Sequence, residues 1–216
     1  MKFTITKIGH SCITYERDGV KIMVDPGDWS PEALKETGLH AIFVTHKHPD
    51  HCFPPALETL MKNNPGVVIK TNSDVGGVLT EKGIAWERFE GGDRLEIGGI
   101  AVEGIGKLHA KIHPEISDIS NTGLMFDDAF FHPGDSHVPP NRAVKVLALP
   151  LISPWNTIEH SIEFARAVKP ENCFNIHDGL LRPEAARLKG IPKEFLAKNG
   201  IEYSVLEDGM SQTFEY

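Results

Sequence analysis

The chain has 216 residues, of which 40% are hydrophobic, and a formal net charge of −8 at pH 7. This length suits one compact domain, so we expect a single domain over residues 1–216. The acidic balance, without clustered Lys and Arg, argues against a long nucleic acid or an anionic membrane as partner.

The N-terminal segment predicts a meander of three strands at residues 2–8, 11–16 and 20–24. Its start alternates apolar and polar residues and lacks the continuous apolar core of a secretory signal. The strands are separated by the turns Gly9-His10-Ser11 and Arg17-Asp18-Gly19. Asp25-Pro26-Gly27 follows, and a short helix near residues 31–37 leads to the next strand.

A short apolar run, Ala41 to Val44, predicts a buried strand that ends in the segment His46-Lys47-His48-Pro49-Asp50-His51. Pro49 prevents a regular ladder, so the polar residues should lie on a strand-end loop. Imidazole nitrogens and carboxylate oxygens are ligands that Zn²⁺ accepts. Alternate spacing sends His46 and His48 to one side while Asp50 and His51 diverge, which leaves room for two neighbouring ions; the alternative is a His-rich surface loop.

The middle of the chain alternates helical and extended patterns. Pro54-Pro55 predicts a helix start and the segment 63–66 its end. A strand is expected at 67–70, a helix capped by Ser73 and running to Gly83, and β segments at 84–89 and 94–97.

The second half repeats the strand-to-ligand arrangement. A strand at 100–108 should deliver His109, and a hairpin at 121–132 should deliver Asp135. A strand at 144–149 precedes a helix from Thr157 to Val168, and a strand at 173–176 delivers His177. The chain should close with helices at 183–189 and 192–199, broken by Gly190, and with strands at 202–206 and 212–215.

Four β segments therefore end in a potential ligand: His46, His109, Asp135 and His177. Ligand pockets commonly form where the loops of packed sheets meet, because rigid strands position side chains at open ends. The order of these ligands resembles that of the metallo-β-lactamase superfamily. The Gly9-His10-Ser11 turn is similar to that of the subgroup containing L-ascorbate 6-phosphate lactonase. This resemblance implies an α/β fold, a four-layer αββα sandwich of two mixed sheets with helices outside.

The resemblance also implies a ligand set for two divalent ions, with Zn²⁺ expected and Mn²⁺ or Fe²⁺ as alternatives. One ion would be held by His46, His48 and His109, the second by Asp50, His51 and His177, with Asp135 bridging both. His113 competes with His109 for its place. Asp135 could instead be an ordinary turn aspartate, and His177 a histidine that caps a turn.

Several residues are expected around this set. Asp25 is the best candidate to orient ligands from behind. His10 either contacts substrate or only packs, and Trp155 either lines the pocket or packs at its rim. The remaining histidines are expected to be structural or solvated: His40, His132, His137 and His160.

The implied activity is metal-dependent hydrolysis of a small ester-like, lactone or phosphodiester substrate by a hydroxide bridging two ions. Asp50 and His10 are the candidate catalytic residues, with Asp50 or a metal-bound water handling the proton. Lys107 and Lys111 could attract an anionic group or be solvated. The alternative is a metal-binding scaffold or sensor without turnover; substrate and oligomeric state are not readable from the sequence.

The three cysteines are an odd number in dissimilar surroundings: Cys12, Cys52 and Cys173. A disulfide framework is therefore not expected, which favours a reducing, cytoplasmic setting. Cys52, beside the metal loop, is interpreted as a small buried neighbour. No stretch approaches the roughly twenty apolar residues of a membrane span.

Overall fold

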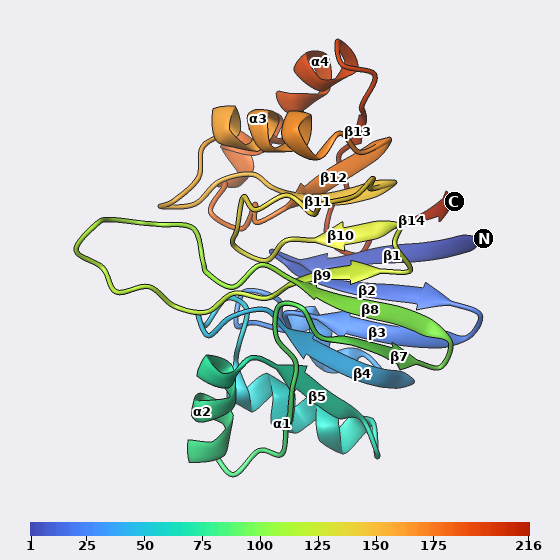
Figure 1. The fold of residues 1–216 in the computed structure, drawn as a ribbon, viewed down its shortest axis with the longest axis vertical. Coiled ribbons are helices and arrows are strands. Elements are labelled where there is room, and N and C mark those ends of the chain that lie inside the picture. Colours follow the sequence, from blue (N-terminus) through green and yellow to red (C-terminus); the bar gives the residue numbers. More distant parts are fainter.

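The computed structural model describes residues 1–216, which form two seven-stranded sheets flanked by helices (Figure 1). In the first sheet, the last strand of the chain pairs with the first strand of the N-terminal meander. Its order is β14 (Ser211–Glu215), β1 (Lys2–Gly9), β2 (Cys12–Arg17), β3 (Val20–Val24), β4 (Leu39–Val44), β5 (Val68–Thr71) and β6 (Glu87–Arg88).

The second sheet is built from the rest of the chain and also mixes parallel and antiparallel pairs. Its order is β13 (Glu202–Ser204), β12 (Asn172–Ile176), β11 (Val146–Pro150), β10 (Phe130–His132), β9 (Gly123–Phe126), β8 (Ile100–Ile105) and β7 (Arg94–Ile97). Both sheets are therefore mixed, as expected.

Helices cover the outer faces of the two sheets. Figure 1 shows α1 (Pro54–Asn63) and α2 (Ser73–Glu81) at one end, and α3 (Ile158–Val168) and α4 (Pro192–Ala197) at the other. A cluster of 21 buried hydrophobic residues, rich in aromatic rings, fills the space between the sheets. Clusters of 15 and 14 residues lie under the two helical layers. The expected four-layer αββα sandwich is confirmed.

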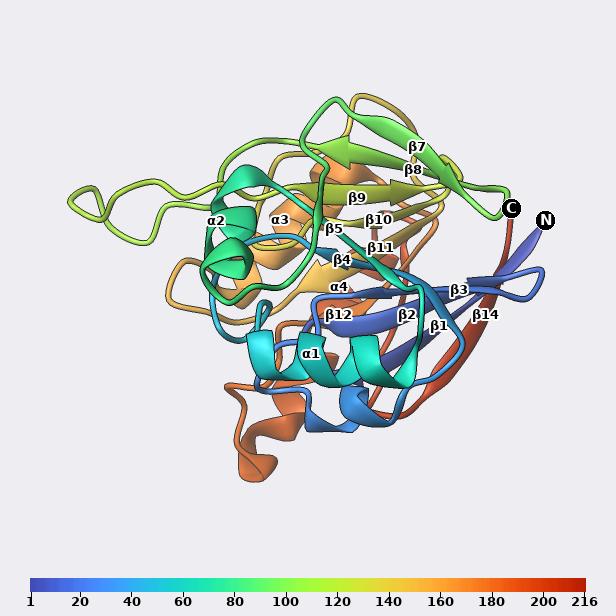
Figure 2. The same ribbon diagram turned by 90° about the horizontal axis from the view of Figure 1, so that it is seen from below.

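Strand direction brings the ends of distant strands to one edge. β1 and β2, then β2 and β3, pair antiparallel, and β3 and β4 pair parallel, so β1, β3 and β4 run the same way. By the same reasoning β8, β10, β11 and β12 share one direction. The long loop between β8 and β9 projects away from the chain termini in both views (Figures 1 and 2).

Several local predictions were wrong in detail. Asn72, not Ser73, caps α2: its side chain accepts the Val75 N–H, while the Ser73 hydroxyl donates to Glu90. The strand predicted to reach residue 108 ends at Ile105, because Gly106 adopts a φ of +77° and turns the chain.

The helical segments also differ from expectation. The predicted helices near 31–37 and 183–189 are 3₁₀ segments, η1 (Pro31–Lys35) and η2 (Pro183–Gly190). Gly190 does not break the chain direction, because η2 runs through it and Ile191 keeps helical dihedral angles before α4. No helix in the structure combines the length and apolar character needed to cross a membrane. All three cysteines are buried and free, with Cys52 in the core beneath α1 as expected.

Candidate metal centre

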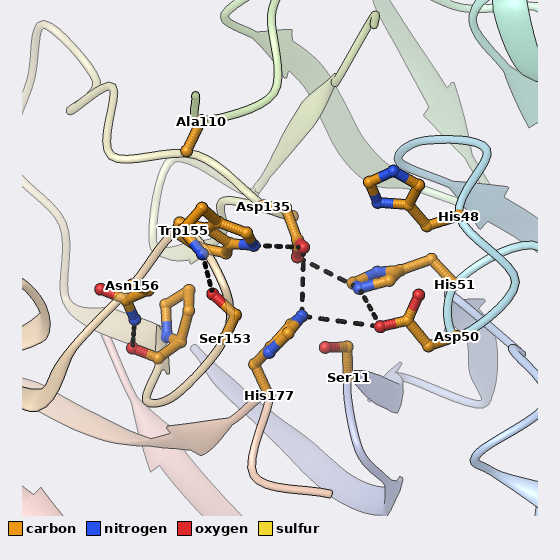
Figure 3. Close-up of polar contacts among 12 residues, drawn as sticks. Ser11, His48, Asp50, His51, Ala110, Asp135, Ser153, Trp155, Asn156 and His177 are labelled. Atoms are coloured by element: carbon orange, nitrogen blue, oxygen red, sulfur yellow. Dashed lines mark hydrogen bonds and ion pairs between the residues drawn. The ribbon is translucent and has the colours of Figure 1, made fainter. Parts of the chain in front are cut away.

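Seven residues predicted as ligands converge at the edge where the parallel strands end. Figure 3 shows His48, Asp50, His51, Asp135 and His177 among them. Each follows a strand in one of the two sheets, so the rigid sheets fix where the side chains start. His46 and its loop follow β4, His109 follows β8, Asp135 follows β10 and His177 follows β12. Two groups of potential ligand atoms result.

The first group contains His46, His48, His109 and Asp135, whose ligand atoms all lie within 4.8 Å of one another. His109 Nε2 lies 3.3 Å from Asp135 Oδ2, and His46 Nε2 lies 3.7 Å from the same oxygen. His48 is half-buried at the open side, with Nδ1 at 3.1 Å from His46 Nε2. This group has the three imidazoles and one carboxylate expected for one ion.

The second group contains Asp50, His51 and His177, together with His10. Asp50 Oδ2 lies 3.8 Å from His51 Nε2 and 3.7 Å from His177 Nε2. These side chains point toward a common centre in Figure 3. The sequence did not predict that His10 would join them.

Asp135 lies between the two groups. Its Oδ1 is 3.1 Å from His51 Nε2, and its Oδ2 is 3.1 Å from His177 Nε2. The same carboxylate faces His46 and His109 of the first group. Asp135 is thus the residue within reach of both groups, as a bridging ligand must be.

Hydrogen bonds at Nδ1 leave the Nε2 atoms of the buried histidines facing inward. His51 Nδ1 donates to Asp25 Oδ2 at 2.7 Å, and His177 Nδ1 donates to the carbonyl of Ile152 at 2.8 Å. His109 Nδ1 donates to the carbonyl of Ala110. An imidazole that donates through Nδ1 presents the lone pair of Nε2, which is the arrangement typical of metal-ligating histidines.

Three buried polar atoms of this cluster make no hydrogen bond of regular geometry, although His51 Nε2 lies 3.1 Å from Asp135 Oδ1: they are His51 Nε2, His109 Nε2 and Asp135 Oδ1. Buried polar atoms are normally satisfied, because leaving one without a partner costs about 1–3 kcal/mol. All three face the space between the ligand groups. The residues present therefore fit a divalent cation, which would take the lone pairs that the protein leaves free.

The charge states of the histidines differ across the cluster. Burial lowers the pKa of His46 and of His48, so both are neutral and ready to bind a cation. Burial also opposes the charge on His51 and His177, but Asp135 together with Asp25 raises the pKa of His51, and Asp135 together with the Ile152 carbonyl raises that of His177. A cation at the second group must therefore displace protons, so its affinity should fall as the pH falls.

Asp25 and Thr45 hold the metal loop from beneath. Asp25 Oδ1 accepts the Thr45 N–H and Oδ2 accepts the Thr45 hydroxyl, each at 2.7 Å. Asp25 also fixes His51, so the expectation that it orients a ligand agrees with the geometry. The sequence did not single out Thr45; its position between the strand and His46 is the only signal available.

Asn121 is a second residue that the sequence did not single out. Its side chain accepts the Asp135 N–H at 3.0 Å and donates to the Pro133 carbonyl at 2.9 Å. Gly134 between them has a φ of +60°, and a Cβ there would lie 2.3 Å from Asn121 Oδ1. The absence of a side chain at Gly134 is what lets Asn121 hold the turn of Asp135.

His10 is buried behind Asp50 instead of lining the cavity. The Gly179 N–H donates to His10 Nδ1 at 3.0 Å, so Nε2 carries the hydrogen and donates to Asp50 Oδ2 at 3.1 Å. Burial lowers the pKa of His10 to about 4, consistent with a neutral ring. The two roles expected for His10 were contact with substrate and packing. His10 does not line the cavity, and beyond packing it holds Asp50 through a hydrogen bond.

Trp155 donates its indole N–H to Asp135 Oδ2 at 2.9 Å. It also lines a cavity of about 380 Å³ that opens over the ligands, together with His48, Asp50, Asp135 and His177. A cavity of this size accommodates a small molecule. Of the two alternatives left open for Trp155, the structure shows that it lines the cavity; its hydrogen bond to Asp135 was not predicted.

The other histidines and the two lysines considered from the sequence lie outside the two ligand groups. His113 is exposed on the long loop, where its ring nitrogen accepts the Glu115 N–H. His132 is buried and contacts the Ser11 carbonyl, while His137 contacts Asn156, in agreement with structural roles. Lys107 and Lys111 are exposed and do not line the cavity, although Lys111 lines a small depression beside His48 and His109.

Comparison with known proteins gives independent evidence. A family model described as "Beta-lactamase superfamily domain" matches residues 4–177. Protein Rv0786c of Mycobacterium tuberculosis is 35% identical over 186 residues, which cover 84% of this chain and 86% of that protein. A metal-dependent hydrolase of Methanocaldococcus jannaschii is 30% identical over 139 residues, which cover 61% of this chain and 60% of that protein.

A solved structure resembles the whole chain. Igni18, described as a novel metallo hydrolase from the hyperthermophilic archaeon Ignicoccus hospitalis, matches with a TM-score of 0.77 over 100% of both chains. The sequence identity is 21%, so this similarity supports the fold alone.

Proposed function

Because the chain belongs to the metallo-β-lactamase superfamily and gathers two ligand groups around Asp135, we propose that it is a metal-dependent hydrolase with two divalent ions. The observation that carries this proposal is the set of buried ligand atoms without partners, which face one another beneath an open cavity. Zn²⁺ is the proposed metal, with Mn²⁺ or Fe²⁺ accepted according to supply. The proposed substrate is a small ester-like, lactone or phosphodiester compound.

Each ligand group would hold one of the two ions. His46, His48 and His109 would hold one ion, while Asp50, His51 and His177 would hold the other, with Asp135 shared. When bound, two divalent cations lower the pKa of water toward neutrality and polarise the oxygen of the group under attack. The nucleophile in this proposal is thus water, without a Ser or Cys intermediate.

The protein's own contribution is to orient the reacting groups. His10 fixes Oδ2 of Asp50, which leaves Oδ1 to accept a hydrogen from the attacking water. Asp50 is suited to this role as an ionised group, because hydrogen bonding from His10 and the nearby His51 overcome burial and lower its pKa to about 2. Trp155 holds Asp135 in the same way through its indole N–H. Both carboxylates are therefore placed before substrate arrives.

The proposal is tested by removing metal with a chelator and adding back Zn²⁺, Mn²⁺ or Fe²⁺ under anaerobic conditions. We expect two equivalents bound per chain by elemental analysis, and hydrolysis of at least one chromogenic ester, lactone or phosphodiester that depends on added metal. If the protein binds two ions firmly but hydrolyses none of these substrates, the result would instead support the non-catalytic metal-binding scaffold.

A matched pair of variants tests the ligand assignment. His109→Ala should lower the bound metal from two equivalents toward one and reduce kcat/KM by more than about 100-fold, because even residues that only support a ligand cost 10–100-fold. His113→Ala removes the same ring from an exposed site four positions along the chain and should leave metal content unchanged. Equal metal loss in both variants would contradict the assignment.

A further inference from the structure

The cavity over the candidate metal centre has an apolar rim. Trp29, Ile112 and Leu180 line it, although 43%, 36% and 45% of their surfaces respectively are exposed. Pro154 and Trp155 extend this apolar wall toward Asp135. The three exposed residues come from three distant segments, so their meeting at one opening is a feature of the fold and not of one apolar stretch.

The charged groups that line the cavity are acidic or belong to the histidine cluster. Asp28, Asp50 and Asp135 contribute carboxylates, and no Lys or Arg side chain lines the cavity. Asp28 sits at the rim beside Trp29, away from the shared ligand position. Asp50 and Asp135 would be neutralised by the ions that they hold, so a negatively charged tail that extends beyond the metal ligands would meet the Asp28 carboxylate and no Lys or Arg to pair with.

Three lysines on other segments, Lys107, Lys111 and Lys189, make contacts outside this cavity. Lys111 Nζ donates to the Ile116 carbonyl at 2.8 Å and to Asp118 Oδ1 at 2.7 Å, within its own loop. Lys107 lines a separate depression that also contains Glu90. Lys189, beyond Leu180, pairs with Asp178 and Glu207. None of these three lysines lines the cavity.

We propose that the substrate carries an uncharged apolar group of several carbons, which packs against Trp29, Ile112 and Leu180 while the scissile group lies at the metals. This inference rests on the proposed function and narrows it to apolar esters, lactones or related compounds. Substrates whose non-reacting part is an anion, such as phosphorylated sugars, are disfavoured because the rim offers the Asp28 carboxylate and no Lys or Arg. Apolar contact at the rim would supply binding free energy remote from the reacting bond.

The test uses alkyl hydroxamates, whose head group chelates metal and whose single tail must then lie in the cavity. We expect binding to the Zn²⁺-loaded protein, measured by calorimetry, to tighten by about twofold to fourfold per added methylene from acetohydroxamate to octanohydroxamate. Pentanohydroxamate should bind at least about tenfold more tightly than glutaric acid monohydroxamate, which has a carboxylate in place of its terminal methyl. An affinity that does not change with tail length, or tighter binding of the glutarate compound, would overturn the inference.

Substitutions at the rim test whether the hydroxamate tail binds there. Leu180→Lys adds a cation at the rim and should shift the preference toward the glutarate compound, and Ile112→Ser should weaken the dependence on tail length. Val138→Lys is the matched control, since Val138 is 48% exposed but lines a different depression. The same change of preference in Val138→Lys would contradict the assigned site.

Binding and turnover separate the two proposals. Tail-length dependence without hydrolysis of any ester, lactone or phosphodiester would defeat the proposed function and leave the apolar site standing. Metal-dependent turnover with no dependence on the tail would defeat only the apolar site.

Discussion

His10 shows how one side chain couples the two ends of the chain at the site. Its Nδ1 accepts from Gly179 and its backbone carbonyl accepts the His177 N–H at 2.9 Å, while Nε2 donates to Asp50. Its ring packs 4.1 Å from the His177 ring, centroid to centroid. We infer that His10 is a positioning residue, which acts on the reaction through Asp50.

Removing the His10 donor should therefore impair the site without unfolding the protein. We expect His10→Ala to lower kcat/KM by about 10–100-fold, the usual cost of losing a partner of a metal-binding carboxylate. His10→Gln restores an N–H of similar reach and should recover part of this loss. Equal activity losses in the two variants, at equal melting temperature, would show that His10 serves only packing.

Left-handed backbone conformations also gather at this site. Asp25 and His177 have φ values of 51° and 56°, although neither is glycine. Such conformations persist only where the surroundings enforce them. Here each residue has its side chain fixed by hydrogen bonds, Asp25 to Thr45 and His51, and His177 to the Ile152 carbonyl.

At the scale of elements, the turn after β3 supports the loop after β4. Gly27 lies so close beneath this loop that an added Cβ would sit 1.9 Å from the Asp50 carbonyl oxygen and 2.5 Å from the His51 nitrogen. The Asp28 N–H also donates to the Pro49 carbonyl at 2.9 Å. The two strand ends thus form one unit, and a side chain at position 27 must displace the backbone that carries two ligands.

Gly27→Ala should consequently weaken metal binding and lower the melting temperature together. The control is Gly77→Ala in α2, where an added Cβ meets nothing within 4 Å. That change should instead stabilise the helix by about 0.5–1 kcal/mol, the usual gain of Ala over Gly inside a helix. Metal titration and thermal unfolding of both variants give the comparison; unchanged metal affinity in Gly27→Ala would contradict the support role.

Across the whole molecule, a buried ion network joins the first strand to the C-terminal third. Lys7, whose side chain is fully buried, lies 3.0 Å from Asp178 Oδ1, and Lys189 lies 3.0 Å from Asp178 Oδ2. Asn175 donates to the same carboxylate at 2.8 Å. Because Asp178 follows His177 directly, this network also anchors the segment that carries the last ligand.

Asp178→Asn should lower the free energy of unfolding by about 3–5 kcal/mol at pH 7, because it leaves the buried Lys7 charge without its buried partner. Burial opposes the charge of Asp178, but Lys7 and Lys189 outweigh it and hold its pKa below the usual value. Its stabilisation is therefore present above the unfolded pKa of about 4 and is lost as the pH falls through the lower folded pKa.

Denaturant unfolding of the wild type and Asp178→Asn from pH 7 downward measures this effect. The difference in stability should shrink on acidification. Asp208→Asn is the control, since Asp208 also pairs with Lys7 but its side chain is 60% exposed, and its effect should be smaller. A difference that stays constant as the pH falls would refute the ionic origin.

The sequence by itself indicated most of the strands and the residues placed at their ends, because alternation, turns and apolar runs are local properties. His46, His109, Asp135 and His177 could be identified in this way; the four-layer fold was implied by the resemblance of their order to that of the metallo-β-lactamase superfamily. The sequence did not identify the residue that caps α2, because the neighbours Asn72 and Ser73 can both form such a hydrogen bond.

Only the tertiary structure decided which of these residues meet which others. The bond of His10 to Gly179 spans 169 positions, and those of Asp50 to His10 and Trp155 to Asp135 span 40 and 20. The apolar rim likewise takes its residues from three separate loops. Such contacts depend on how the two sheets pack and which way their strands run, and no local pattern in the chain encodes them.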